Sequence, residues 1–189
     1  MQHFKDYTGS VYGGLGHLLY AYCQAVGYPI SEQLEKAQNL ERFDYALWLE
    51  LLNDLDSHLH IPALGLEIAK YVQPKHLGIL GYIALSCENL GEALTRYHDF
   101  HRLIYDGSSL YVAVEGENLC FGWVEMPIEL TTQLSNEVAM ALIIQFMKHF
   151  VAHDDISSAR FILLTLPRKI RHCMSSTLIV KFASLKAGR

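Results

Sequence analysis

The sequence has no hydrophobic run long enough to cross a membrane. Its two most apolar stretches, LGILGYIAL and VAMALIIQFM, are about half as long as a membrane-spanning helix. The first residues, MQHFKDYTGS, also lack the basic segment and the apolar run of a secretory signal peptide. We therefore expect a cytoplasmic protein that has no membrane partner.

Cysteine and charge are both sparse. The four cysteines, Cys23, Cys87, Cys120 and Cys173, form no Cys-x-x-Cys pair, so we expect them to be reduced and mostly buried. Charged residues make up 19% of the chain and hydrophobic residues 51%, a composition that supplies a core and excludes a disordered protein. A length of 189 residues indicates one domain, or one domain with a short appendage.

Acidic side chains are absent from residues 160–189, which hold seven Lys and Arg residues and a net charge of +7. Residues 1–159 hold all 20 acidic residues against eight basic ones, which gives a net charge of −12. Such an acidic body is not suited to binding nucleic acid itself. The change of sign near Arg160 marks a break in composition.

The motifs of common catalytic sites are missing as well. The Gly13-Gly14-Leu15-Gly16 run follows no predicted strand and lacks the lysine of a phosphate-binding loop, so it predicts a loop that leads into a helix. No Gly-x-Ser-x-Gly sequence occurs. His149 and His153 have a spacing that metal ligands use on helices, but the glutamate of a zinc protease is not between them. We expect no enzyme, no cofactor and no metal site.

What the sequence does have is hydrophobic residues at a spacing of 3.6, which predicts helices in its first half. These cover residues 16–26, 31–40, 43–55 and 64–72, and a further helix begins after Asn89. In the third of them, Phe43, Leu47, Leu51 and Leu55 fall on one face. Residues 134–153 are apolar on most faces, which predicts a central helix.

The period changes from 3.6 to 2 after Asp106-Gly107. Apolar residues alternate over residues 110–114 and again over 119–124, with a turn at 115–118 between them, which predicts a β-hairpin. Residues 160–166 predict another strand. The fold class is therefore α+β, with a helical N-terminal half followed by an antiparallel β-hairpin or small sheet packed on a long core helix.

The stretch KHLGILGYIALSCENLGEAL joins an apolar, glycine-containing run to the start of a polar helix. Gly78 and Gly81, three residues apart, allow close backbone packing, and Tyr82 follows them directly. Asn89 is placed as the N-cap of the next helix, and Glu92 stands three residues later, as in a capping box. We interpret these five residues as a structural motif.

Aromatic residues with a polar edge gather where the helix beginning after Asn89 meets the hairpin. They are Tyr97, His101, Tyr105, Tyr111 and Trp123. Such side chains combine an apolar body with a hydrogen-bonding group, and this suits the lining of a small-ligand pocket. The alternative is a core that contains a few polar tips.

Four segments carry a resemblance to a known family. They are HIP at residues 60–62, LGLEI at 64–68, LGILGYIALS at 77–86 and LGEAL at 90–94. In this order and at these separations, from about Gly14 to Pro167, the chain resembles the N-terminal arabinose-binding-like sensor domain of one branch of the AraC-family transcription regulators. Asn89 stands where the family usually has Thr, and both residues can cap the helix.

The resemblance implies a cytoplasmic domain over residues 1–161 that senses a small-molecule effector and forms a homodimer. In the family, DNA is bound by a basic C-terminal region with two helix-turn-helix motifs. This chain ends before such a region, so we expect a truncated regulator in which the sensor residues do not bind DNA. The alternative is a free-standing ligand-binding module that acts through a partner protein. The identity of the effector does not follow from the resemblance.

Residues 162–189 depart from the family pattern, which continues with spaced histidine, proline, tyrosine, phenylalanine and cysteine. Permitted codons for residues 161–181, read in a shifted frame, can encode all five of these anchors in register. They give lysine, however, where the family has a proline directly after the cysteine. We therefore interpret residues 162–189 as a basic tail produced by a frameshift near Arg160 or Phe161, with an early stop after it. The competing interpretation is a divergent but genuine end of the same domain.

Overall fold

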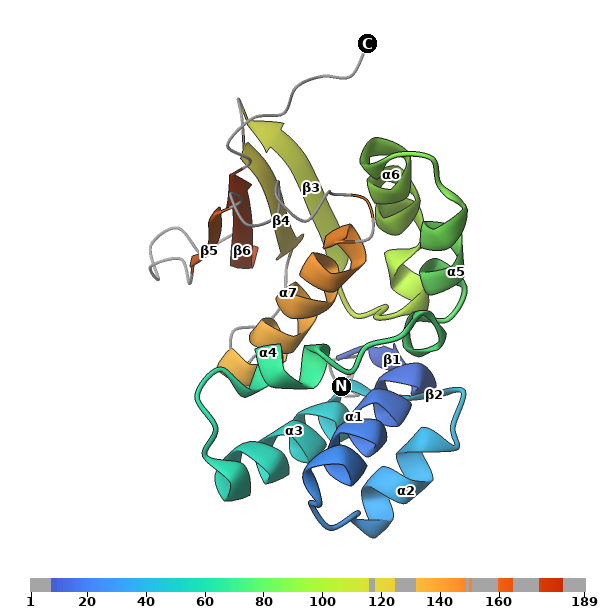
Figure 1. Ribbon diagram of the computed structural model, residues 1–189, viewed down its shortest axis with the longest axis vertical. Coiled ribbons are helices and arrows are strands. Elements are labelled where there is room, and N and C mark those ends of the chain that lie inside the picture. Colours follow the sequence, from blue (N-terminus) through green and yellow to red (C-terminus); the bar gives the residue numbers. More distant parts are fainter. Residues whose placement is uncertain are drawn as a thin grey trace, which may run out of the picture.

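The computed structural model describes residues 8–115, 118–124, 132–148, 150, 160–164 and 174–181. Helices form one part of the molecule and an antiparallel sheet another, and the long helix α7 lies between them (Figure 1). This arrangement confirms the α+β class. The predicted helical N-terminal half and the later hairpin are both present.

A small sheet near the N-terminus consists of two strands that are separated in the sequence by two helices. Strand β1 (Ser10–Tyr12) pairs antiparallel with β2 (Arg42–Asp44), and α1 (Gly13–Val26) and α2 (Glu32–Gln38) lie between them in the sequence. Two predicted helix boundaries are confirmed. Gly27 ends α1 with a φ of 70°, and the Ser31 side chain caps α2 by accepting a hydrogen bond from the Leu34 N–H at 3.2 Å.

The glycine run at residues 13–16 was wrongly predicted to be a loop, because it forms the first turn of α1. Packing accounts for the glycines. A Cβ built on Gly13 would lie 1.8 Å from the carbonyl oxygen of Leu40, and one built on Gly14 would lie 2.6 Å from that of His76. Absent side chains let this helix start pack directly on neighbouring backbone.

Helix α3 (Tyr45–Leu59) starts two residues later than predicted, because Phe43 belongs to β2. Its buried face holds Tyr45, Trp48, Leu51, Leu52 and Leu55, whereas Leu47 is only half-buried. Helix α4 (Leu64–Ala69) follows and packs closely on α7 (Gln133–Lys148). A Cβ on Gly65 would lie 2.5 Å from the Cβ of Glu137, which shows how near the two backbones come.

The motif at residues 78–92 occupies the turn from the short 3-10 helix η1 (Pro74–Leu77) through α5 (Ile79–Ser86) to α6 (Leu90–Phe100). Gly78 has a φ of 56°, a conformation that other residues rarely adopt. A Cβ on Gly81 would lie 2.1 Å from the Pro74 carbonyl oxygen. Both glycines are thus structural, whereas the side chain of Tyr82 is exposed.

The predicted capping box at the start of α6 is half present. The Asn89 side chain accepts a hydrogen bond from the Glu92 N–H at 2.9 Å. The Glu92 carboxylate accepts from the N–H of Glu88 at 3.2 Å, one residue before the cap. The helix then tightens into the 3-10 turn η2 (His101–Leu103), and Phe100 at the end of α6 is exposed.

The second sheet has the strand order β3-β4-β6-β5, and all its pairings are antiparallel. Strands β3 (Ser109–Glu115) and β4 (Asn118–Val124) form the predicted hairpin. Strand β5 (Arg160–Leu164) lies within the range that the sequence predicted. Strand β6 (Met174–Lys181) was not predicted, and it inserts between the hairpin and β5.

A buried core runs from the N-terminal helices through α7 to the inner face of the hairpin, where Leu110, Phe121 and Trp123 lie. Cys23 and Cys120 are buried and Cys87 is half-buried, as expected, while Cys173 lies outside the described residues. In the described part of the chain, no helix is both long enough and apolar enough to span a membrane.

Candidate functional site

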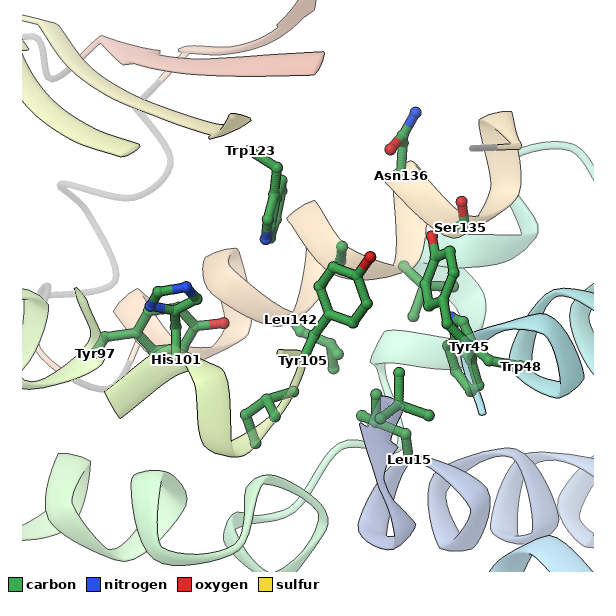
Figure 2. Close-up of a pocket in the computed structure, with 14 residues that line it drawn as sticks. Leu15, Tyr45, Trp48, Tyr97, His101, Tyr105, Trp123, Ser135, Asn136 and Leu142 are labelled. Atoms are coloured by element: carbon green, nitrogen blue, oxygen red, sulfur yellow. The ribbon is translucent and has the colours of Figure 1, made fainter. Parts of the chain in front are cut away.

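A pocket opens where the N-terminal helices, the end of α6, strand β4 and α7 meet (Figure 2). Its cavity volume is about 60 Å³. The lining residues are Val11, Leu15, Tyr45, Trp48, Tyr97, His101, Ile104, Tyr105, Trp123, Ser135, Asn136, Val138, Ala139 and Leu142.

Four of the five aromatic residues singled out from the sequence line this pocket. Tyr97 comes from α6, His101 from η2, Tyr105 from the loop after it and Trp123 from β4. Tyr111 does not join them. In the hairpin register Leu110 pairs with Trp123 and faces inward with it, so the next residue, Tyr111, points to the other face and is 36% exposed.

The remaining lining residues were not singled out from the sequence. Tyr45 and Trp48 come from α3, and Ser135 and Asn136 from the first turns of α7. Tyr45 and Trp48 meet the same criterion of an aromatic body with a polar edge, on the buried face of a predicted helix. Nothing local in the sequence indicates that α3 and α7 meet, because that contact joins segments about ninety residues apart.

His101 uses both of its ring nitrogens to hold the backbone around it. Its Nε2 accepts a hydrogen bond from the Leu110 N–H at 2.9 Å, so Nε2 carries no proton in this arrangement. The proton therefore sits on Nδ1, which donates to the His98 carbonyl at 2.7 Å. His101 thus fixes the start of β3 next to the pocket and presents its ring rather than a polar atom to a ligand.

Other polar groups of the lining are also engaged by the protein. The Tyr105 hydroxyl donates to the Thr8 carbonyl at 3.0 Å, and the ring of Tyr105 packs on that of Tyr45 with centroids 4.7 Å apart. Burial raises the pKa of the Tyr45 hydroxyl, while a hydrogen bond with Ser135 acts in the opposite direction. Tyr45 is therefore neutral at neutral pH, and the side chains of both tyrosines are held in place.

Three buried hydrogen-bond donors of the lining contrast with these groups. The Tyr97 hydroxyl is fully enclosed, and this burial raises its pKa far above the usual range. Its ring packs edge-on against Phe146 with centroids 4.9 Å apart, and Figure 2 shows its hydroxyl directed into the pocket. The indole N–H groups of Trp48 and Trp123 belong to side chains that are 3% and 9% exposed. Within the described residues, none of the three donors has a hydrogen-bond partner.

Buried donors that lack a partner are uncommon in folded proteins, because each loses its bond to water without gaining another. When such groups line a cavity, a bound molecule can supply the missing acceptor. The pocket is therefore a candidate ligand site.

A family model described as the N-terminal arabinose-binding domain of AraC transcription regulators matches residues 21–163. The chain belongs to this family. It is accordingly a sensor domain of a transcription regulator, as its sequence motifs indicated. No curated protein matches the chain.

In this sensor domain, a polar network holds the segment that carries Tyr105. The Arg42 guanidinium donates through Nε to the Ser10 hydroxyl at 2.8 Å and through one terminal nitrogen to the Leu103 carbonyl at 2.7 Å. It also lies 3.3 Å from the Asp106 carboxylate, which accepts the Ser10 N–H at 2.6 Å. The small N-terminal sheet and the pocket loop are thus tied together.

The described lining of the sensor domain contains no Asp, Glu, Lys, Arg or Cys. The described residues also contain no group of three or more His, Cys, Asp and Glu residues that could hold a metal ion, while His149 and His153 lie outside them. What the site offers is an aromatic and aliphatic enclosure with three directed N–H and O–H donors.

Proposed function

We propose that the chain binds a small-molecule effector in the pocket between α3, α6, β4 and α7, and that occupancy of this pocket is the signal it senses. The convergence of three unpartnered buried donors on one apolar cavity carries this proposal. Family membership supports it, since the matched domain is a sensor of regulators. The family description names arabinose, which makes that sugar the first effector candidate to test.

Binding rather than catalysis fits the lining. The described pocket residues include no carboxylate, lysine or thiol that could act as nucleophile or general base. Both ring nitrogens of His101 already form hydrogen bonds with backbone atoms. We propose that the domain acts in the cytoplasm as a homodimer and that DNA contacts belong to a different region of the regulator.

The walls of the pocket come from segments that are distant in the sequence, and this provides a route for a signal. A ligand that contacts Trp48 of α3, Tyr97 of α6 and Asn136 of α7 stabilises the arrangement in which these helices lie together. Any conformation in which they separate loses those contacts. A ligand can shift the equilibrium by as much as its affinities for the two arrangements differ.

A pocket-filling variant tests the proposal. Ala139 of α7 lines the pocket and is half-buried, so Ala139→Phe places a ring in the cavity. The matched control is Ala25→Phe on the exposed side of α1. A metabolite library that includes L-arabinose is screened by thermal unfolding. A ligand present at about 100 times its Kd adds about 2.7 kcal/mol to the stability of wild type, which raises Tm by about 5–10 °C in a domain of this size.

We expect the same compound to stabilise Ala25→Phe and to leave Ala139→Phe unchanged. Ala139→Leu, which fills less of the cavity, replaces Ala139→Phe if the larger ring prevents folding. A compound that stabilises the pocket-filled and control variants equally would show that effectors bind elsewhere.

A further inference from the structure

We propose that the effector is an uncharged, largely apolar molecule that presents one or more hydrogen-bond acceptors, such as a carbonyl, to the pocket. This inference rests on the proposed function, because it assigns a ligand class to the same site. It goes further in naming the chemistry that the lining selects and the chemistry that it rejects.

The absence of charge in the described lining carries the first part of the inference. An ionised carboxylate or ammonium loses its hydration on entering an apolar cavity and needs an opposite charge or several hydrogen bonds in return. The nearest ion pair of the site, Arg42 with Asp106, is already satisfied by Ser10 and Leu103. A charged effector would therefore find no compensating group in the described lining.

The direction of the free hydrogen-bonding groups carries the second part. An indole N–H can only donate, and the side chains of both Trp48 and Trp123 line the pocket. In Figure 2 the nitrogen edge of Trp123 and the hydroxyl of Tyr97 both point toward the centre of the cavity. A ligand acceptor in that space would satisfy donors that have no partner among the described residues.

Two acceptors of the site are, by contrast, already occupied. The Nε2 of His101 accepts from the Leu110 N–H, and the Ser135 hydroxyl accepts from the Thr132 N–H. A free monosaccharide carries a hydroxyl donor on nearly every carbon, and each buried hydroxyl needs an acceptor. The lining thus disfavours a sugar such as L-arabinose and favours a molecule that only accepts.

The two tryptophans give the experiment its readout. The chain contains two Trp residues, and both line the pocket, so its two indole N–H resonances in a ¹⁵N–¹H spectrum both report on this site. A Trp123→Phe variant assigns them. The probes are 1-indanone, a bicyclic ketone with an acceptor and no donor, and indane, the same skeleton without the carbonyl. Indane-2-carboxylate supplies a charge, and L-arabinose supplies the polyhydroxylated alternative.

We expect 1-indanone to move at least one indole proton downfield in a saturable titration, with an affinity about tenfold above that of indane. Indane-2-carboxylate and L-arabinose should leave both resonances in place at the same concentrations. Tyr97→Phe, which removes only the hydroxyl, should lower the affinity for 1-indanone about fivefold and leave indane binding unchanged. Tyr111→Phe, on the outer face of the hairpin, is the control and should change neither.

The outcomes separate this inference from the proposed function. Saturable binding of L-arabinose or of the carboxylate in preference to the ketone would overturn the ligand class and leave effector sensing by the pocket intact. Equal affinities for 1-indanone and indane would overturn the requirement for an acceptor. Unchanged resonances with all four probes would overturn both the ligand class and the assignment of this pocket as the effector site.

Discussion

At the scale of single residues, His76 is the buried ionisable group with the clearest consequence. Its ring lies beneath the surface at the end of η1, where Nδ1 accepts the Gln73 N–H at 3.1 Å and the ring also bonds the backbone of Tyr71. Burial lowers the pKa of His76 from its ordinary 6.5 to about 4, and the nearby charges of Lys75 and His17 act in the same direction. The folded protein therefore holds this imidazole neutral.

This burial makes stability depend on pH in a defined window. Between pH 6.5 and about pH 4 the unfolded chain binds a proton at His76 that the folded chain does not, so stability falls as the pH falls. The contribution is complete above pH 6.5 and amounts to about 2 kcal/mol between pH 7 and pH 5. Urea unfolding should show His76→Gln losing this part of the pH dependence.

The control for that measurement is His98→Gln, which replaces an exposed histidine on α6. It should keep the pH dependence of wild type, because it leaves the buried His76 in place. Parallel pH profiles for wild type and His76→Gln would contradict the burial argument.

Single residues also show which parts of the pocket could be predicted from the sequence. Tyr97, Tyr105 and Trp123 could be selected because an aromatic body with a polar edge is recognisable in any sequence, and all three line the pocket. Tyr111 satisfies the same criterion and lies outside, because the alternation along β3 decides its direction. The use of both His101 nitrogens by backbone atoms depends on the course of the loop before β3, which no local pattern encodes.

At the scale of elements, the turn from η1 into α5 depends on how closely two backbones approach. Replacing Gly81 by Ala places a Cβ 2.1 Å from the Pro74 carbonyl oxygen and 2.6 Å from the Pro74 Cα, and these backbone atoms cannot move without displacing η1. We expect Gly81→Ala to lower the free energy of unfolding by about 2–3 kcal/mol, measured by urea denaturation.

A second glycine of the same region provides the comparison. Gly91 lies in the first turn of α6, and a Cβ there would meet only the Asn89 side-chain oxygen at 3.4 Å, an ordinary contact. Gly91→Ala should be neutral or slightly stabilising, because alanine favours a helix more than glycine does. If both variants lost the same free energy of unfolding, close backbone contact would not be the reason that residue 81 must be glycine.

Elements with a strong local pattern were predictable, and those defined by distant contacts were not. The Asn89 cap, the Ser31 cap and the β3–β4 hairpin follow from short-range signals and are all present. The start of α1 was not predictable, because its glycines are required by close contacts with the backbone of Leu40 and His76, which are far along the chain. The same applies to β6, whose strand pairing with β4 joins segments more than fifty residues apart.

At the scale of the whole molecule, the distribution of charge divides the chain where the second half of its sheet begins. The family match ends at residue 163, eight residues after the last acidic side chain, Asp155. The structure places residues 160–164 and 174–181 as strands beside the hairpin. Strands β5 and β6 thus complete the sheet with sequence that differs in charge from the rest of the domain.

We predict that a frameshift near Arg160 causes that difference, because out-of-frame codons are not selected to keep the acidic balance of the domain. We expect the gene, sequenced onward from the codon for Asp155, to carry the histidine, proline, tyrosine, phenylalanine and cysteine anchors of the family in another frame. That frame should continue into a basic region with helix-turn-helix patterns. If no frame carries the anchors, β5 and β6 are native strands, and the domain has replaced the family's usual sheet edge with a basic one of its own.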